Sequence, residues 1–190
     1  MITSNNLLQF KKYSIFACSL VLMLGCQSAY YSAMEKVGVH KRDIMLDRVE
    51  SAQTAQQDAQ QQFTSALAQL SQLINYDGGD LAAQYELIND QYEASESSAK
   101  EVASRIAAIE SVADALFDEW NDEIQQYSST SLKQQSQQKL KKTQRNYESL
   151  IKSMHRAKDR MAPVLSALKD NSLYLKHNLN AQAIGVLQGE

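Results

Sequence analysis

Residues 81–127 read LAAQYELINDQYEASESSAKEVASRIAAIESVADALFDEWNDEIQQY, and this stretch decides the fold class. Apolar residues recur in it at steps of four and three, with one deviation near the end. A seam of this kind averages about 3.5 residues per step and predicts one long, coiled-coil-like helix. The seam consists of Leu81, Tyr85, Ile88, Tyr92, Ser95, Ala99, Val102, Ile106, Ile109, Ala113, Leu116, Trp120, Ile124 and Tyr127.

Long helices are also predicted on both sides of this stretch, over residues 28–75 and 132–178, followed by a short one over residues 180–190. The later stretch has apolar residues at steps of seven: Leu140, Tyr147, Met154, Met161, Leu168 and Leu175. The earlier stretch has a looser stripe: Met45, Val49, Ala52, Ala59, Phe63, Leu67, Leu70 and Ile74. Glutamines at positions 56, 57 and 60–62 thin this stripe, so its middle is expected to be the weakest part of the core.

Turn and cap signals separate the three long segments. Gly78 and Gly79 suit a tight turn after the first segment, and Asp80 is placed to cap the helix that follows. The hydroxyl cluster at residues 128–131 offers caps for the next helix, in which Pro163 predicts a kink. Each segment has a length of about 70 Å at 1.5 Å per residue. We therefore expect an all-α protein, an elongated antiparallel bundle of three long helices with a short C-terminal helix.

The N-terminus has the pattern of a bacterial lipoprotein signal peptide. Two lysines, Lys11 and Lys12, precede an apolar run over residues 13–24, which is followed by Gly25 and Cys26. The run is much shorter than the ~20 apolar residues that a spanning helix requires. We therefore predict that residues 1–25 are removed, that Cys26 is lipidated, and that residues 26–190 form a single helical domain.

The residues that follow Cys26 suggest how the mature chain meets the membrane. Gln27 stands where an Asp would be the usual signal for retention in the inner membrane, so we expect an anchor on the periplasmic face of the outer membrane. Tyr30 and Tyr31 lie a few residues further on, where amphipathic rings suit the headgroup region. Both tyrosines are predicted to contact the membrane surface.

Charge and cysteine content restrict the function classes. Without Lys11 and Lys12 the 19 basic side chains fall to 17 against 22 acidic ones, a net charge of −5, which argues against nucleic acid as a partner. Cys26 is then the only cysteine, so stability depends on packing rather than on an intramolecular disulfide. Acidic residues dominate positions 77–123 and basic residues dominate positions 133–160, which is expected to favour antiparallel register; the alternative is a basic face that binds nucleic acid or anionic lipid.

Motifs of catalysis or cofactor binding are absent from the sequence. It contains no phosphate loop, no G-x-S-x-G and no H-E-x-x-H. The histidines His40, His155 and His177 are scattered; His155 is four residues from Asp159, which predicts an ion pair rather than a metal site. We therefore predict no enzymatic activity, no cofactor and no metal.

Several blocks of the sequence match one family together. The blocks SAYYSAMEKVGVHKRD (28–43), DGGD (77–80), ALFDEW (115–120) and LYLKHNLN (173–180) resemble the bacterial domain-of-unknown-function family DUF2959. The resemblance covers essentially the whole mature chain and implies an exported lipoprotein built of long helices, without implying any activity or site residue. Similar proteins continue past the counterpart of residue 190, which implies that this chain is shortened at its C-terminus.

Two functions fit these observations. The preferred one is a non-enzymatic, lipid-anchored periplasmic rod that contacts a protein partner, or a second copy, through its helical surfaces. The alternative is an envelope protein that binds a small molecule, lipid or metal between its helices. The alternative requires a cavity, such as a void lined by Tyr85, Tyr92 and Tyr147.

Overall fold

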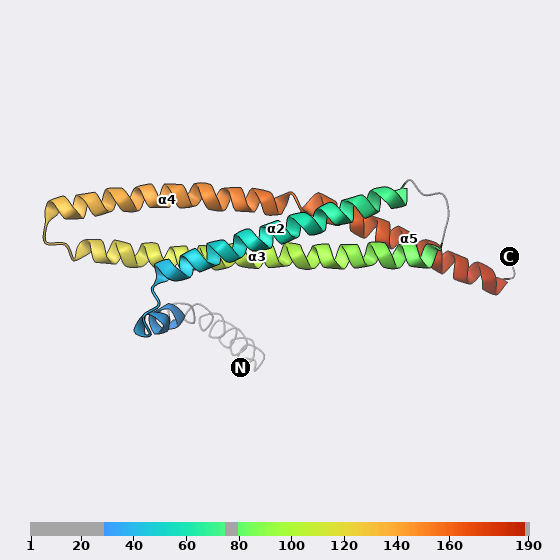
Figure 1. Cartoon of the computed structure of the whole chain (residues 1–190), viewed down its shortest axis with the longest axis horizontal. Coiled ribbons are helices and arrows are strands. Elements are labelled where there is room, and N and C mark those ends of the chain that lie inside the picture. Colours follow the sequence, from blue (N-terminus) through green and yellow to red (C-terminus); the bar gives the residue numbers. More distant parts are fainter. Residues whose placement is uncertain (1–28, 75–79, 189–190) are drawn as a thin grey trace, which may run out of the picture.

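The computed structural model describes residues 29–74 and 80–188, and these form helices, turns and short connections with no strand among them. A short helix covers residues 29–36. It is followed by four long ones: α2 (Lys41–Ile74), α3 (Leu81–Gln125), α4 (Thr130–Asp159) and α5 (Ala162–Gln188) (Figure 1). The all-α prediction is confirmed. The predicted signal peptide and Cys26 lie outside the described residues.

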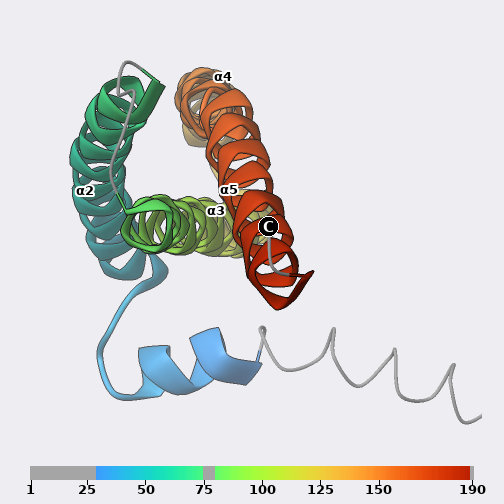
Figure 2. The ribbon, with the colours of Figure 1, turned by 90° about the vertical axis from the view of Figure 1, so that its right-hand side faces the viewer.

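The long helices form an elongated antiparallel arrangement around α3. Both α2 and the successive pair α4 and α5 run antiparallel to α3 (Figure 1). Seen from one end, α2 and α5 lie on opposite sides of α3 (Figure 2). Each of the other three long helices packs against α3, whereas α2 and α5 touch each other at few points. Among the described helices, none is both long and apolar enough to cross a bilayer.

The predicted seam of α3 is its buried face. The most buried residues of α3 are Ile88, Ser95, Val102, Ile106, Ile109, Val112, Ala113 and Ile124. The residues spaced by seven on α4 and α5 meet this face, with Leu140, Met154, Leu168 and Leu175 buried. The stripe of α2 differs in one respect from the prediction, because Leu67 is 43% exposed and Ala66 is fully buried instead. The reason is periodicity: Ala59, Phe63, Ala66 and Leu70 follow steps of four, three and four, which keeps them on one face.

The first predicted helix, over residues 28–75, is interrupted at residues 37–40. Gly38 has φ of +86°, and the amides of Val39 and Gly38 donate to the carbonyls of Met34 and Glu35 at 3.0 Å each. This is the hydrogen-bond pattern of a Schellman motif, which ends a helix at a glycine in the left-handed region. The chain therefore turns before α2 begins, so the helix over residues 29–36 can fold back on the bundle.

The helix predicted over residues 132–178 is also divided. Pro163 has no amide hydrogen to donate, and its ring would clash with the carbonyl of Asp159 in a continuous helix. Therefore α4 ends at Asp159, and α5 begins at Ala162 with Pro163 in its first turn. Pro163 thus separates two helices instead of kinking one. The prediction of a separate short helix over residues 180–190 was wrong, because α5 continues without a break to Gln188.

The predicted helix caps are present where the structure describes them. The carboxylate of Asp80 accepts hydrogen bonds from the amides of Ala82, at 2.9 Å, and Ala83, at 3.5 Å. The hydroxyl of Ser129 accepts one from the amide of Leu132 at 3.4 Å. These caps satisfy amides that have no partner within their helix. The preceding turn, with Gly78 and Gly79, lies outside the described residues.

Candidate functional site

The helix over residues 29–36 docks on the bundle through an apolar contact. Tyr31, Ile44 and Val112 form a small buried cluster that joins this helix to α2 and α3, and Tyr31 is only 2% exposed. Met34 and Val39 pack against the cluster. The contact fixes the position of the chain segment that begins three residues after Cys26. We call this region the N-terminal junction and define it by Tyr31, Glu35, Lys41, Arg48 and Glu119.

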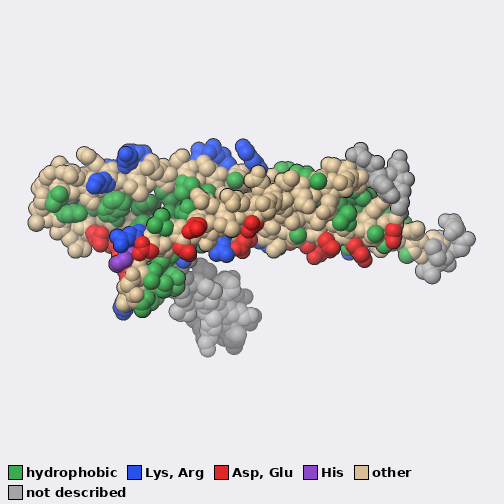
Figure 3. Space-filling model, in the orientation of Figure 1, with side chains coloured by type: hydrophobic (Ala, Val, Ile, Leu, Met, Phe, Trp, Pro, Cys, Tyr) green, Lys and Arg blue, Asp and Glu red, His purple; other side chains and the backbone are tan. Residues whose placement is uncertain are grey.

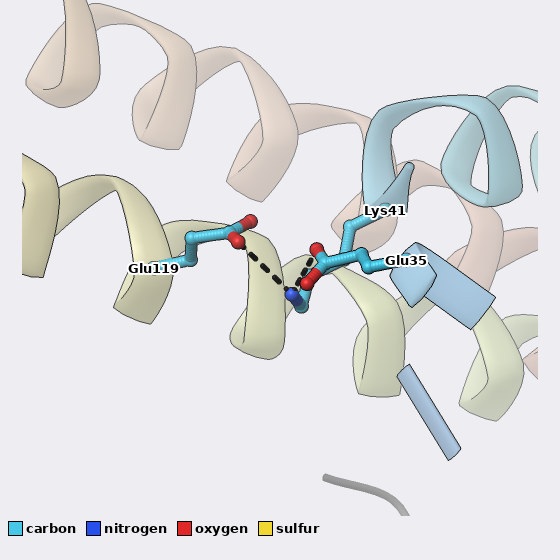
Figure 4. A network of polar contacts seen from close by, with 3 residues as sticks. All are labelled: Glu35, Lys41 and Glu119. Carbon is cyan, nitrogen blue, oxygen red and sulfur yellow. Dashed lines mark hydrogen bonds and ion pairs between the residues drawn. The ribbon is translucent and has the colours of Figure 1, made fainter. Parts of the chain in front are cut away.

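Lys41 is the central charge of the N-terminal junction. Its ammonium group is paired with the carboxylate of Glu35 from the short helix and lies 3.1 Å from Oε1 of Glu119 in α3 (Figure 4). Lys41 itself is 9% exposed. Removing an ammonium group from water is costly unless it is paired, and here two carboxylates compensate it. The three residues come from three helices, so their contact ties all three together.

The ion pairing shifts the proton affinities of these groups. The hydrogen bond from Lys41 holds the pKa of Glu35 below its ordinary value of 4.5. Burial by itself lowers the pKa of Lys41, but hydrogen bonds and charges from Glu35 and Glu119 outweigh burial and raise it above 10.5. The pairing therefore favours the charged form of both Lys41 and Glu35.

Arg48 supplies a second polar connection at the N-terminal junction. Its Nη1 donates to the hydroxyl oxygen of Tyr31 at 2.7 Å and to the backbone carbonyl of Ala108 in α3 at 2.6 Å. The Tyr31 hydroxyl also lies 2.8 Å from Oγ of Ser111. The polar tip of this buried tyrosine is thus satisfied inside the protein.

This geometry corrects the prediction for Tyr31. A side chain that is 2% exposed and hydrogen-bonded to α2 and α3 does not contact a membrane surface. The reason is the turn at Gly38, which folds the short helix back on the bundle. Tyr30 differs: it is 46% exposed, and its ring meets the Tyr31 ring edge-on with centroids 5.3 Å apart. A membrane contact of Tyr30 stays a prediction.

The histidines do not form a common site. Nε2 of His155 lies 2.7 Å from Oε1 of Glu110 in α3, whereas the predicted partner, Asp159, lies 3.2 Å from Nζ of Lys158. His155 of α4 therefore contacts α3 and not the predicted partner in its own helix, Asp159. Within the described residues, no group of three or more His, Cys, Asp or Glu side chains is placed to hold a metal ion.

Opposite charges on α3 and α4 do not join these helices as expected. Among the described residues, the only contact between a basic and an acidic side chain that links α3 to α4 is that of His155 with Glu110, which is an ion pair only when the imidazole is protonated. The two basic residues of α3, Lys100 and Arg105, pair within their own helix. In the view of Figure 3, lysines and arginines lie along the edge formed by α4, while the opposite edge has most of the acids together with a few lysines and arginines. Charge is therefore sorted across the width of the rod.

The seam tyrosines serve mainly in packing. Tyr85 and Tyr92 pack against a core cluster shared by α2, α3 and α5, while Tyr147 packs against a different one. The ring of Tyr147 meets that of Phe117 edge-on at 5.4 Å, and burial, with the nearby charges of Asp114 and Glu110, raises the pKa of Tyr147 to about 12. The three tyrosines thus do not surround a common void.

Sequence reasoning missed the polar residues of the N-terminal junction. Glu35 and Lys41 lie within the block 28–43, and Glu119 lies within the block 115–120, so both blocks supply the contact. The available signal was Gly38, whose position marks a helix end between Glu35 and Lys41. Recognising it would have placed these two residues on separate helices.

Comparison with known proteins identifies a family but no characterised relative. The model of the family DUF2959, described as a protein of unknown function, matches residues 30–190. The match confirms the resemblance drawn from the sequence blocks. No curated protein and no solved structure matches the chain.

Substitution of Lys41 by Met tests the N-terminal junction. Because Glu35 and Glu119 lose their shared cation, we expect amide exchange in residues 29–36 to accelerate by roughly tenfold. Hydrogen exchange read by mass spectrometry measures this. Arg42→Met is the matched control, since the Arg42 side chain is 72% exposed and pairs with its neighbour Asp43 at 3.4 Å. Equal protection of residues 29–36 in Lys41→Met and the parent chain would contradict the assignment.

The same junction is expected to weaken in acid. The pKa of Glu35 is lowered by its hydrogen bond to Lys41, so its stabilising contribution is present above the ordinary value of 4.5 and is lost as pH falls through the lower folded value. Exchange protection of residues 29–36, corrected for intrinsic rates, should therefore decline below pH 4.5. Glu35→Gln should remove most of this dependence. A profile that is identical in both proteins would refute the role of Glu35.

Proposed function

We propose that this chain, which belongs to the DUF2959 family of proteins of unknown function, is a lipid-anchored helical rod of the bacterial cell envelope that acts by contact with another protein. The observation that carries the proposal is the combination of a signal-like N-terminus ending at Cys26 with an elongated helical body. The sequence presents no nucleophile with its base, so the proposal contains no catalytic step.

The N-terminal junction supports the anchoring part of this proposal. The described chain begins three residues after Cys26, and the helix over residues 29–36 is held to α2 and α3 by Tyr31 and Lys41. A lipid on Cys26 would therefore be joined to the rod by a very short segment. Gln27, in place of an Asp, favours the periplasmic face of the outer membrane as the location.

The length of the rod and the surface of α5 support the contact part. With 45 residues, α3 extends over about 68 Å at 1.5 Å per residue. The C-terminal part of α5 projects past the start of α3 (Figure 1). From its middle onward, α5 exposes the large apolar side chains of Leu173 (42%), Tyr174 (67%) and Ile184 (56%). Apolar side chains of this size gathered on one exposed helix are typical of a surface that packs against another protein.

Replacement of Cys26 by Ser tests the anchor. We expect the variant to lose incorporation of a fatty-acid probe and to leave the membrane fraction, because the thiol is the acylation site. In-gel detection of an alkyne-tagged palmitate, together with membrane fractionation, measures both effects. Cys18→Ser is the matched control, since Cys18 belongs to the segment that is removed. Label retained at the parent level in Cys26→Ser would overturn the anchor.

Site-specific crosslinking in intact cells tests the contact surface. A photoreactive phenylalanine in place of Tyr174 is expected to give a discrete crosslinked product with a partner protein or a second copy. The same substitution at Tyr127, a tyrosine that is 44% exposed near the turn between α3 and α4, should not. Mass spectrometry of the product identifies the partner. Absence of any product at Tyr174, at normal expression, would contradict the proposed contact.

A further inference from the structure

A groove runs between α2 and the region where α4 gives way to α5. Its lining residues come from α2, α4, α5 and the link between α4 and α5, and the open groove has a volume of about 590 Å³. This volume lies within the range of about 300–1,000 Å³ that is usual for small-molecule sites. The groove exists because α2 and α5 pack on α3 and touch each other little. We call it the α2/α5 groove.

The walls of the α2/α5 groove combine apolar side chains with polar ones of α2, which are Gln53, Gln56, Gln57, Gln60 and Thr64. Ala59, which is fully buried, and Phe63, which is 7% exposed, contribute from α2. Leu67 is 43% exposed and extends the same wall, while Met161 and Val164 face it from the other side. Because Ala59 and Phe63 are almost fully buried, the accessible apolar surface of the groove is mainly that of Leu67, Met161 and Val164.

One cation and no acid belong to the described lining of the groove. Arg160 follows the last residue of α4, is exposed, and makes no ion pair among the described residues. Gln56 also lines the groove, and its Nε2 atom is shielded from solvent without a hydrogen-bond acceptor among the described residues. The groove thus combines apolar side chains with glutamines and an exposed guanidinium.

The length of the groove matches a single long acyl chain. Its α2 wall runs from Gln53 to Leu67, which is about 21 Å at 1.5 Å per residue. One acyl chain needs about 15 Å, half of the roughly 30 Å hydrocarbon core that two leaflets share. The α2 wall is therefore longer than one tail, whereas the opposite wall, residues 157–164, faces only part of that length.

We propose that the α2/α5 groove binds a long-chain fatty acid, with its tail along Phe63, Leu67 and Val164 and its carboxylate at Arg160. Carboxylate and guanidinium form strong, charge-assisted hydrogen bonds, and an acid-free lining does not repel the anion. The site goes beyond the proposed contact function and does not depend on the anchor at Cys26.

Binding of palmitate by the full, delipidated chain tests this site. We expect saturable binding in equilibrium dialysis, weakened roughly tenfold by Arg160→Gln because a charged hydrogen-bond partner is lost. Hexadecanol, which has the same tail without the charge, should bind Arg160→Gln and the parent chain alike. Arg156→Gln is the matched control, since Arg156 is an exposed α4 arginine that bonds Ser153 at 3.0 Å and does not line the groove.

A second variant and a mapping experiment complete the test. Leu67→Glu places an acid in the groove at a position that is already partly exposed, so it should weaken palmitate binding with an unchanged circular dichroism melting curve. A diazirine-bearing palmitate should label peptides that contain Phe63 or Val164. The proposal is overturned by any of three results: no saturable binding, an equal effect of Arg160→Gln on palmitate and hexadecanol, or a concentration-dependent dimer that Leu67→Glu abolishes without palmitate binding.

Discussion

Burial of one face of α3 is the constraint on which the rest of the structure depends. A single helix with a continuous apolar face is unstable in water until other helices cover that face. In this chain α2 covers one side of it and α4 with α5 covers the other, and each core cluster includes residues of α3. Because α3 occupies the central position, its two partners meet each other only sparsely. The same constraint therefore produces both the elongated rod and the α2/α5 groove.

Polar contacts between the packed faces fix how each helix is aligned along its neighbours. Gln62 of α2 donates to Gln91 of α3 at 3.0 Å, and Trp120 of α3 donates to Ser136 of α4 at 2.9 Å. Near the start of α3, the hydroxyl of Ser172 in α5 donates to Oδ1 of Asn89 at 3.0 Å. A sliding movement of any helix would leave these groups unpaired, which costs more than the hydrogen bond itself contributes. Such contacts, rather than ion pairs between α3 and α4, fix how the helices align.

The N-terminal junction and the α2/α5 groove divide the molecule into regions with different chemistry. At the junction a nearly buried cation, Lys41, holds two carboxylates and so joins three helices. In the groove a cation, Arg160, lies beside apolar side chains. The charges at the junction are paired within the protein, so their role is structural. The guanidinium of Arg160 has no described partner and is able to bind a ligand. An anchored rod with both features would hold its binding surface at a defined place relative to the membrane.

Periodicity predicted the helical class and most of the core, because a heptad pattern is local information that lies within one helix. The antiparallel order was predicted from long segments of similar length joined by short turns. The caps at Asp80 and Ser129 followed in the same way. The position of Tyr31 depended on tertiary structure: whether an aromatic side chain meets a membrane or a core is decided by the turn at Gly38 and by α3, which lies far along the chain. The groove was equally beyond sequence reasoning, since it arises where two helices that are not neighbours in sequence touch each other at few points.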